Sequence, residues 1–455
     1  MEKQKSQLEV THAELLQALA NNETKVFRKR FLDMHFYDQA HFYLSLEPDQ
    51  RKQLYRVLNA HEVGDFFDTI EDDLPEMTEL LAEMDTQYAA NMLNDMFDDN
   101  AADILEHLPK EDVDRYLSLM NRSDAIKLRK LLHYDTETAG GIMTTDYVSV
   151  LEDLDVGQAL AELKRVAADA ETIYYVYVVN SDNLLVGVLT LRDLLVHDSH
   201  TKLAEIMTPN AITASVHDEQ AEVAQKIRDY DFIALPVVDD QQKLVGIITV
   251  DDAIEVIDDE AQSDYSGLAG VDVDYVSENP FKAASKRLPW LITLLFLGMS
   301  TATLINHYEA LLSTASILAV FISLITGTAG NAGTQSLAVA VRRLAVNGDN
   351  KPKIWRLVLS EVLTGLVTGV ITGLTVMLIV GIWKQNLILG VTIGLAMAAA
   401  ITVANLAGSL IPMLMEKIGF DPAVASGPFI TTLSDLTSVL IYFSIAQFFL
   451  NAFLN

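Results

Sequence analysis

One aspartate lies deep within the last apolar segment of the chain. Asp435 follows Asp421 by 14 residues, which corresponds to about 21 Å along a helix at about 1.5 Å per residue. A charged carboxylate at that depth costs about 2.5–3.5 kcal/mol on insertion scales, so it normally faces a water-filled path or a partner. The central parts of the apolar segments hold no Lys or Arg. We therefore expect Asp435 to face a transported cation; the alternative is a protonated or hydroxyl-bonded aspartate used in packing.

Possible oxygen ligands for such a cation occur nearby. Pro428 has no N–H, so we expect it to interrupt the last span and to leave the carbonyl of Val424 without its helical donor. Free carbonyls at membrane depth are tolerated where they line a cavity, and oxygen ligands suit magnesium or its hydration shell. The segment from Gly327 to Ser336 is small and polar, and it offers further amide and hydroxyl oxygens. A third span carries glycines at i+4 spacing, which favours helix packing instead.

A second group of acids crowds one predicted helix ahead of the apolar segments. Its members are Asp251, Asp252, Glu255, Asp258, Asp259 and Glu260. Like charges three and four residues apart destabilise an isolated helix. Divalent cations that bridge this helix to acidic neighbours would remove the conflict, so we interpret the group as a cation sensor. The alternative is that these acids only keep a cytosolic domain soluble.

The elements that must position these acids divide the chain by composition. The chain has 63 acids and a net charge of −31, yet only six acids follow residue 279. Such an acidic first part excludes bulk attraction to nucleic acid or anionic lipid and suits a cationic partner. Cysteine is absent, so disulfides and thiolate metal sites are excluded. The polar N-terminus lacks the apolar stretch of a secretory signal, so we expect the acidic part to stay in the cytosol.

Five apolar stretches are long enough to cross a bilayer. They run near Leu288–Asn306, Leu312–Val341, Leu357–Trp383, Leu387–Met415 and Ala423–Phe453. Nine of the ten Lys and Arg residues after residue 279 lie before the first span or in the second–third and fourth–fifth loops. The positive-inside rule makes that side cytosolic. An odd number of spans then places the C-terminus outside.

An internal repeat occupies residues 138–258. The segment from Gly141 to Val150 resembles that from Glu205 to Ala214, and the strand–turn–strand patterns that follow also correspond. Each copy predicts helix, strand, turn, strand and helix, with turns at 181–183 and 240–242. Residues 1–137 predict short stacked helices, because large apolar residues recur every 12 positions from Met84 to Met120.

The repeat resembles a tandem pair of CBS domains, at about 138–199 and 200–258. Pairs of this family often bind adenine nucleotides, so the resemblance implies a possible ATP site. Thr190 and Asp193 match the ribose- and phosphate-contacting positions, while aromatic side chains would stack on a base and Arg192 would contact phosphate. The aromatic candidates are Tyr174, Tyr175 and Phe232. The alternative is that Tyr175 and Phe232 belong to the core and that Asp193 caps a helix.

The whole order of parts resembles the MgtE family of magnesium channels and transporters. The motifs that carry the resemblance are the Gly-rich segment around Asn331 and Gln335, the pair Asp421-Pro422, and Thr431-Thr-Leu-Ser-Asp435. The resemblance implies a homodimer in a bacterial inner membrane, with the pore between the second and fifth spans. It assigns ion contacts to Asp435, Asp421, Thr431, Asn331 and the backbone carbonyl of Gly427, where some relatives carry an amide side chain.

The same resemblance implies a gate. Magnesium bound between the helical domain, the CBS pair and a plug helix would close the pore, with Asp99, Asp103 and Asp252 as ligands beside the acids of the predicted helix. We thus expect an all-α superhelical domain (1–137), an α+β CBS pair (138–258), an acidic plug helix (259–280) and a transmembrane domain of five helices (281–455).

Other classes fit the sequence less well. A membrane-anchored CBS nucleotide sensor without transport is the main alternative, but it would not need Asp435. A CBS-regulated anion channel would need cationic sites within the spans. We expect no enzyme, because no Walker A lysine motif, nucleophile elbow or histidine metal site is present.

Overall fold

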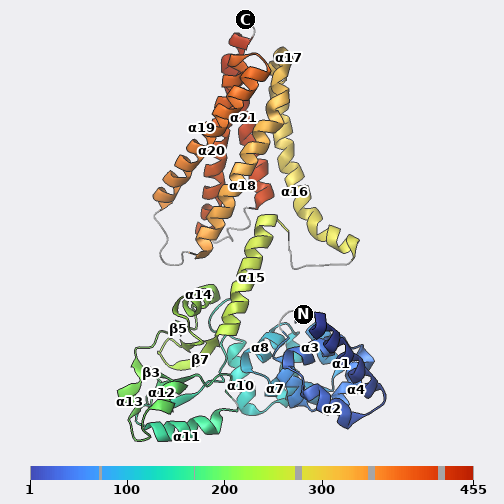
Figure 1. Ribbon diagram of the computed structural model, residues 1–455, viewed down its shortest axis with the longest axis vertical. Coiled ribbons are helices and arrows are strands. Elements are labelled where there is room, and N and C mark those ends of the chain that lie inside the picture. Colours follow the sequence, from blue (N-terminus) through green and yellow to red (C-terminus); the bar gives the residue numbers. More distant parts are fainter. Residues whose placement is uncertain are drawn as a thin grey trace. The chain divides into compact units, whose positions relative to one another are not determined.

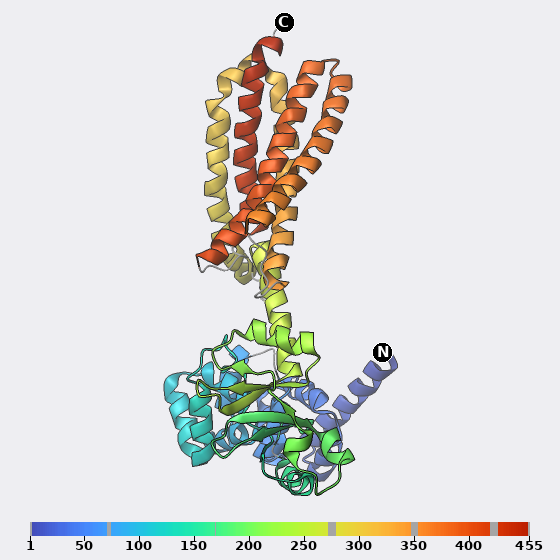
Figure 2. The same ribbon diagram turned by 90° about the vertical axis from the view of Figure 1, so that its left-hand side faces the viewer.

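The computed structural model describes residues 2–70, 74–168, 170–271, 279–346, 354–418 and 426–453. The chain forms two compact units, Met1–Ile257 and Asp258–Asn455 (Figure 1). Figure 2 gives the same ribbon from the side. The first unit combines short helices with two small sheets, and the second is made of long helices.

Short helices build the N-terminal part of the first unit, as the 12-residue recurrence predicts. They are α1 (Glu2–Ala20), α2 (Thr24–Leu32), α3 (Phe36–Leu44), α4 (Pro48–Val57), α5 (Ala60–Phe67), α6 (Leu74–Glu83), α7 (Thr86–Asp95), α8 (Asp98–Glu106), α9 (Lys110–Leu119) and α10 (Arg122–Leu131). Met84, Met96 and Leu108 each follow the end of a helix and are buried. Side-chain caps separate the helices: Asp85, for example, accepts hydrogen bonds from two backbone N–H groups at the start of α7.

The two repeats have the predicted order of elements. The first contains β1 (Ser149–Leu151), α11 (Val156–Val166), β2 (Tyr175–Val179), β3 (Leu185–Thr190) and α12 (Leu191–Val196). The second contains α13 (Leu203–Ile206), β4 (Thr208–Pro209), β5 (Ala214–Ser215), α14 (Gln220–Tyr230), β6 (Ala234–Val238), β7 (Leu244–Thr249) and α15 (Val250–Ala269). β2 pairs antiparallel with β3, and β6 with β7. Asn183 and Gln242 both have a φ of 63°, so the two turns share one left-handed position.

The repeats exchange the segments that precede them. β4, at the start of the second repeat, pairs with β3 of the first, whereas Thr144, at the start of the first, bridges to Ile247 of β7. A Cβ on Gly187 would lie 2.7 Å from the sulfur of Met207, and one on Gly246 would lie 2.7 Å from the sulfur of Met143. Each glycine therefore admits the methionine of the other repeat.

The second unit contains five helices that are long and apolar enough to cross a membrane. Its elements are α16 (Pro280–His307), α17 (Glu309–Thr314), the 3-10 helix η1 (Ser316–Phe321), α18 (Ile322–Val346), α19 (Ile354–Trp383), α20 (Leu387–Lys417) and α21 (Gly427–Phe453). The five predicted spans are confirmed, although α17 and η1 precede α18 where one continuous helix from Leu312 was expected.

Helix α20 packs against α18, α19 and α21 within this unit (Figure 1). The glycines of α19 allow its close contact with α20. A Cβ on Gly369 would lie 2.6 Å from the carbonyl oxygen of Ala398, and one on Gly373 would lie 2.5 Å from that of Gly394. The interpretation of these glycines as packing residues is confirmed.

Candidate cation sites

An acidic cavity of about 620 Å³ lies within the first unit. The first turn of α8, the ends of α5 and α7, the loops of the first repeat and the start of α15 supply its walls. Its acidic lining residues are Asp65, Asp68, Asp95, Asp98, Asp124, Asp146, Glu171, Asp251, Asp252 and Glu255. Lys127 is the one Lys or Arg among the described residues that line it. Such a lining attracts cations and disfavours anions.

Two of these carboxylates converge with that of Asp99. Asp99, Glu171 and Asp252 each offer an oxygen, and these atoms all lie within 4.8 Å of one another. Asp99 is only 5% exposed, and one oxygen of Glu171 is buried without a hydrogen-bond partner among the described residues. Three hard oxygen ligands at this separation fit a divalent ion of the magnesium or calcium type.

Burial and mutual repulsion make these groups hard to ionise without a metal. Burial, then the charges of Glu171 and Asp252, raise the pKa of Asp99 well above its usual range. The same effects, burial first and Asp252 next, raise the pKa of Glu171 to about 8. Burial also raises the pKa of Asp68 to about 7, although Asn100 and the N–H of Phe97 donate hydrogen bonds to it. A bound divalent cation would favour the ionised carboxylates and so lower the pKa values of the cluster.

The predicted sensor residues divide into two sets. Asp99 and Asp252 belong to the converging cluster, and Asp251 and Glu255 line the same cavity. Asp103 lies one turn after Asp99 on α8, and its side chain is exposed. Desolvation by the surrounding protein, followed by repulsion from Glu106 and Asp252, raises its pKa to about 7. The remaining predicted ligands are exposed on α15 beyond the cavity lining: Asp258, Asp259 and Glu260.

Glu171 was not predicted. It lies in the loop between α11 and β2, and its backbone N–H donates to the carbonyl of Asp146 at 2.9 Å. Its partners Asp99 and Asp252 are distant in the sequence, so no local spacing connects them. The second repeat gives no hint either, since Tyr230 occupies the matching position.

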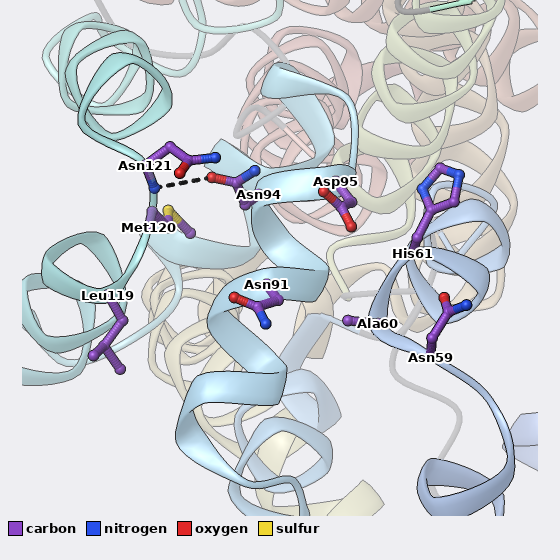
Figure 3. Close-up of a pocket in the computed structure, with 9 residues that line it drawn as sticks. All are labelled: Asn59, Ala60, His61, Asn91, Asn94, Asp95, Leu119, Met120 and Asn121. Carbon is purple, nitrogen blue, oxygen red and sulfur yellow. Dashed lines mark hydrogen bonds between the residues drawn. The ribbon is translucent and has the colours of Figure 1, made fainter.

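A second, polar pocket of about 410 Å³ adjoins this cavity (Figure 3). Helices α5, α7 and the α9–α10 junction line it, and His61, Asn94 and Asp95 belong to both spaces. The carbonyl oxygen of the Asn94 side chain accepts a hydrogen bond from the backbone N–H of Asn121 at 3.2 Å. This contact ties α7 to the start of α10, the helix that carries Lys127.

In the second unit, three predicted ion contacts share one face of α21. Gly427, Thr431 and Asp435 follow one another at i+4 spacing, and Asp435 is half-buried. Small residues of α18 lie opposite: a Cβ on Gly330 would lie 3.4 Å from the methyl group of Thr431. A Cβ on Gly427 would lie 3.0 Å from the carbonyl oxygen of Leu268 near the end of α15. This face of α21 thus combines an acid, a hydroxyl group and a helix N-terminus.

The expected interruption at Pro428 is wrong. Helix α21 begins at Gly427, so Pro428 occupies its first turn, where an N–H has no helical acceptor and proline costs nothing. The carbonyl of Pro428 accepts hydrogen bonds from the hydroxyl groups of Thr431 at 2.9 Å and Thr432 at 2.8 Å. Asp421 and Val424 lie outside the described residues.

Asn331 lies in a different polar space from the α21 face. It lines a cavity of about 550 Å³ with Gln335 on α18 and a ladder of α19 threonines. The same cavity contains Glu361, a buried acid within α19 that was not singled out from the sequence. Arg343 donates to one oxygen of Glu361 at 3.0 Å, and Ser336 donates to the other at 3.0 Å. Glu361 therefore ties α19 to two positions of α18 that lie about two turns apart.

The nucleotide candidates are only partly brought together. Tyr175 lies directly opposite Thr190 in the β2–β3 pairing. The side chain of Tyr174, the residue before Tyr175, is 60% exposed. Thr190 and Asp193 form the capping box of α12, in which the threonine hydroxyl donates to the carboxylate at 2.7 Å. Arg192 is exposed. Phe232 stacks on Tyr230 with ring centroids 5.5 Å apart. It packs against the hydrophobic core that the helical part shares with the second repeat, not against the core that contains Tyr175.

Comparison with known proteins covers nearly the whole chain. Residues 322–445 match the family model described as MgtE, divalent cation transporter; residues 34–137 match the MgtE intracellular N domain; residues 139–200 and 203–259 match the CBS domain. The magnesium transporter MgtE of Enterococcus faecalis is 61% identical over 98% of this chain and 99% of its own. The chain belongs to the MgtE family. The magnesium transporter MgtE of Bacillus subtilis is 35% identical over 95% of this chain and 96% of its own.

Solved structures of MgtE cytosolic parts resemble the first unit. The soluble part of a magnesium transporter is 49% identical, with a TM-score of 0.55, and covers 56% of this chain and 99% of its own. The cytosolic domain of the Mg²⁺ channel MgtE in complex with ATP is 35% identical, with a TM-score of 0.51, over 54% of this chain and 99% of its own. The fold expected from the sequence is confirmed, and the chain is a multi-pass membrane protein of a non-enzymatic transporter family.

Proposed function

We propose that this MgtE family chain carries Mg²⁺ across the membrane along the face where α21 meets α18. The observation that carries the proposal is Asp435, a half-buried acid within an apolar helix, on one face with Thr431 and Gly427. A relative 61% identical over nearly the full chain is a magnesium transporter. Magnesium gives up its water reluctantly, so Asp435, Thr431 and the carbonyl of Gly427 would contact its hydration shell. Asp421 and Asn331 are proposed as further contacts along the path.

The path is proposed to lie between two copies of the chain. A single Asp435 leaves a hydrated divalent ion with one negative partner, whereas two aspartates facing each other across a symmetry axis match its charge. Without the ion, these two carboxylates would repel each other. The functional form is therefore proposed to be a homodimer.

Cytosolic magnesium is proposed to close the path. The converging carboxylates of Asp99, Glu171 and Asp252 need a cation to be ionised together, so magnesium favours the arrangement that joins the helical part, the CBS pair and α15. The closeness of the Leu268 carbonyl to Gly427 supports a plug role for residues 259–280. The remaining proposed sensor ligands are Asp103, Asp251, Glu255, Asp258, Asp259 and Glu260.

An adenine nucleotide is proposed to modulate this gate. A relative's cytosolic domain is in complex with ATP, which supports a site in the CBS pair. The exposed ring of Tyr174 is available for stacking, and Arg192 for a phosphate. Because Thr190 and Asp193 already bond each other, a ribose would have to share or displace that bond.

The domain limits and orientation given by the sequence are kept as proposals: residues 1–137, 138–258, 259–280 and 281–455, with the N-terminus in the cytosol of a bacterial cell and the C-terminus outside. The basic residues at one end of the spans support this orientation.

Magnesium uptake into proteoliposomes tests the path. Asp435→Asn keeps the size of the side chain and removes its charge; we expect uptake to fall at least about tenfold, equivalent to about 1.4 kcal/mol in the barrier. The matched control is Glu309→Gln, an exposed acid on α17, and it should transport like the wild type. Normal uptake by Asp435→Asn would overturn the path and favour the nucleotide sensor without transport.

A further inference from the structure

Lys127 on α10 reaches acids of two different parts of the first unit. Its Nζ lies 3.1 Å from an oxygen of Asp98 and 3.1 Å from an oxygen of Asp146. Asp98 begins α8 in the helical part, whereas Asp146 belongs to the segment before β1 of the first CBS repeat. One ammonium group therefore joins the helical part to the CBS pair.

The two carboxylates that this ammonium group contacts are largely buried, although the lysine side chain itself is 41% exposed. The side chains of Asp98 and Asp146 are 8% and 18% exposed. The hydroxyl of Thr145 donates to Asp98, and the backbone N–H of Asp98 donates to Asp146 at 3.3 Å. Two carboxylates this close and this buried would repel each other strongly without a cation between them.

Asp98 and its neighbour Asp99 thus lie beside groups of opposite charge. Asp98 faces an ammonium group that is part of the chain, whereas Asp99 faces the carboxylates of Glu171 and Asp252. Asp98 lines the acidic cavity, and so do Glu171 and Asp252, the two partners of Asp99. Closing this interface brings five carboxylates together, and Lys127 supplies positive charge for two of them.

We propose that Lys127 is a built-in cation that does for Asp98 and Asp146 what magnesium does for Asp99, Glu171 and Asp252, and that it thereby sets the magnesium concentration at which the gate closes. The proposal rests on the magnesium gating proposed above. With the lysine present, magnesium has only the second group of acids to neutralise. Without it, closure must also overcome the repulsion between Asp98 and Asp146, so more magnesium is required.

The test uses the full chain in proteoliposomes, with uptake measured as internal magnesium is varied. Lys127→Met keeps the aliphatic stem and removes the charge. We expect the internal magnesium concentration for half-inhibition to rise at least about fivefold, the lower end of ordinary coupling between sites. Uptake at low internal magnesium should stay unchanged, because Lys127 lies outside the proposed path. Lys127→Arg should restore the wild-type midpoint.

Two further variants separate charge balance from damage to the fold. Lys130→Met alters an exposed lysine on the same helix and should leave the midpoint unchanged. Adding Asp98→Asn and Asp146→Asn to Lys127→Met removes the repulsion, so the midpoint should return toward that of the wild type even if Lys127→Met alone folds poorly.

The outcomes are distinct. A wild type that internal magnesium does not inhibit would overturn the gating proposal itself. A wild type that is inhibited, with Lys127→Met inhibited at the same concentration, would overturn the role of Lys127 and leave the gating proposal intact. A triple variant whose midpoint stays raised would overturn the charge-balance explanation.

Discussion

At the scale of single residues, the protonation of Glu171 links magnesium binding to pH. Its pKa is raised from 4.5 to about 8, first by burial and then by Asp252. A raised carboxyl pKa means that the folded, metal-free protein keeps a proton that the unfolded chain releases. The contribution of Glu171 to metal-free stability is therefore greatest below about pH 4.5 and declines as the pH rises toward about 8. Magnesium must displace this proton, so its affinity should increase over the same range.

We predict a corresponding pH dependence in thermal unfolding of the full chain. The magnesium concentration that gives half-maximal stabilisation should fall between pH 6 and pH 8. Glu171→Gln removes the titrating group, so it should flatten this dependence and weaken magnesium binding by about tenfold if one ligand contributes about 1.4 kcal/mol. The metal-free variant should be more stable than the metal-free wild type at pH 8. An unchanged pH profile in Glu171→Gln would contradict the role of this residue.

At the scale of elements, Glu361 fastens α19 to α18. Its side chain is 8% exposed, while that of its partner Arg343 is 40% exposed, so solvent screens part of the interaction. The hydroxyl of Ser336 donates to Glu361 at 3.0 Å and lies 2.8 Å from the carbonyl of Asn405 on α20. Three helices of the second unit therefore meet at this acid.

We predict that Glu361→Ala destabilises the second unit by about 2 kcal/mol, below the 3–5 kcal/mol typical of a fully buried pair because Arg343 is partly in solvent. Glu361→Gln retains an acceptor for Ser336 and should cost less. Replacing both partners, as Arg343→Met with Glu361→Met, should recover much of the loss. Unfolding of the purified protein in detergent measures all three. Equal losses in the alanine and the double variant would argue against the ion pair.

Local patterns explain why the elements were predicted better than the sites. Apolar runs and the 12-residue recurrence of Met84, Met96 and Leu108 act within one helix or between neighbours, so they predict spans and short helices directly. Asp99 and Asp252 were identified because of their place in acidic segments that match the family. Glu171 and Glu361 were missed, since each becomes notable only through partners from distant parts of the chain. Pro428 was misread because a proline fits both an interruption and a first turn.

At the scale of the whole molecule, the orientation of the spans can be tested by labelling. The chain contains no cysteine, so one introduced thiol is a unique label. Ser313 on α17 and Ser199 after α12 are both exposed, and the proposed orientation places them on opposite sides of the membrane.

We predict that a membrane-impermeant maleimide labels Ser313→Cys in intact cells and labels Ser199→Cys only after the membrane is opened. Magnesium uptake by both variants should match that of the wild type, which controls for misfolding. Labelling of Ser199→Cys in intact cells would reverse the orientation and place the acidic cavity outside the cell.

The exchange of leading segments between the CBS repeats limits how this module can be inherited. A single repeat cut from the chain would lose the segment that completes its sheet, because β4 pairs with β3 and Thr144 pairs with Ile247. It would also expose an unpaired strand edge, which invites aggregation. Duplication or transfer of one copy alone would thus yield a defective protein. We therefore expect recombination to preserve the two copies together.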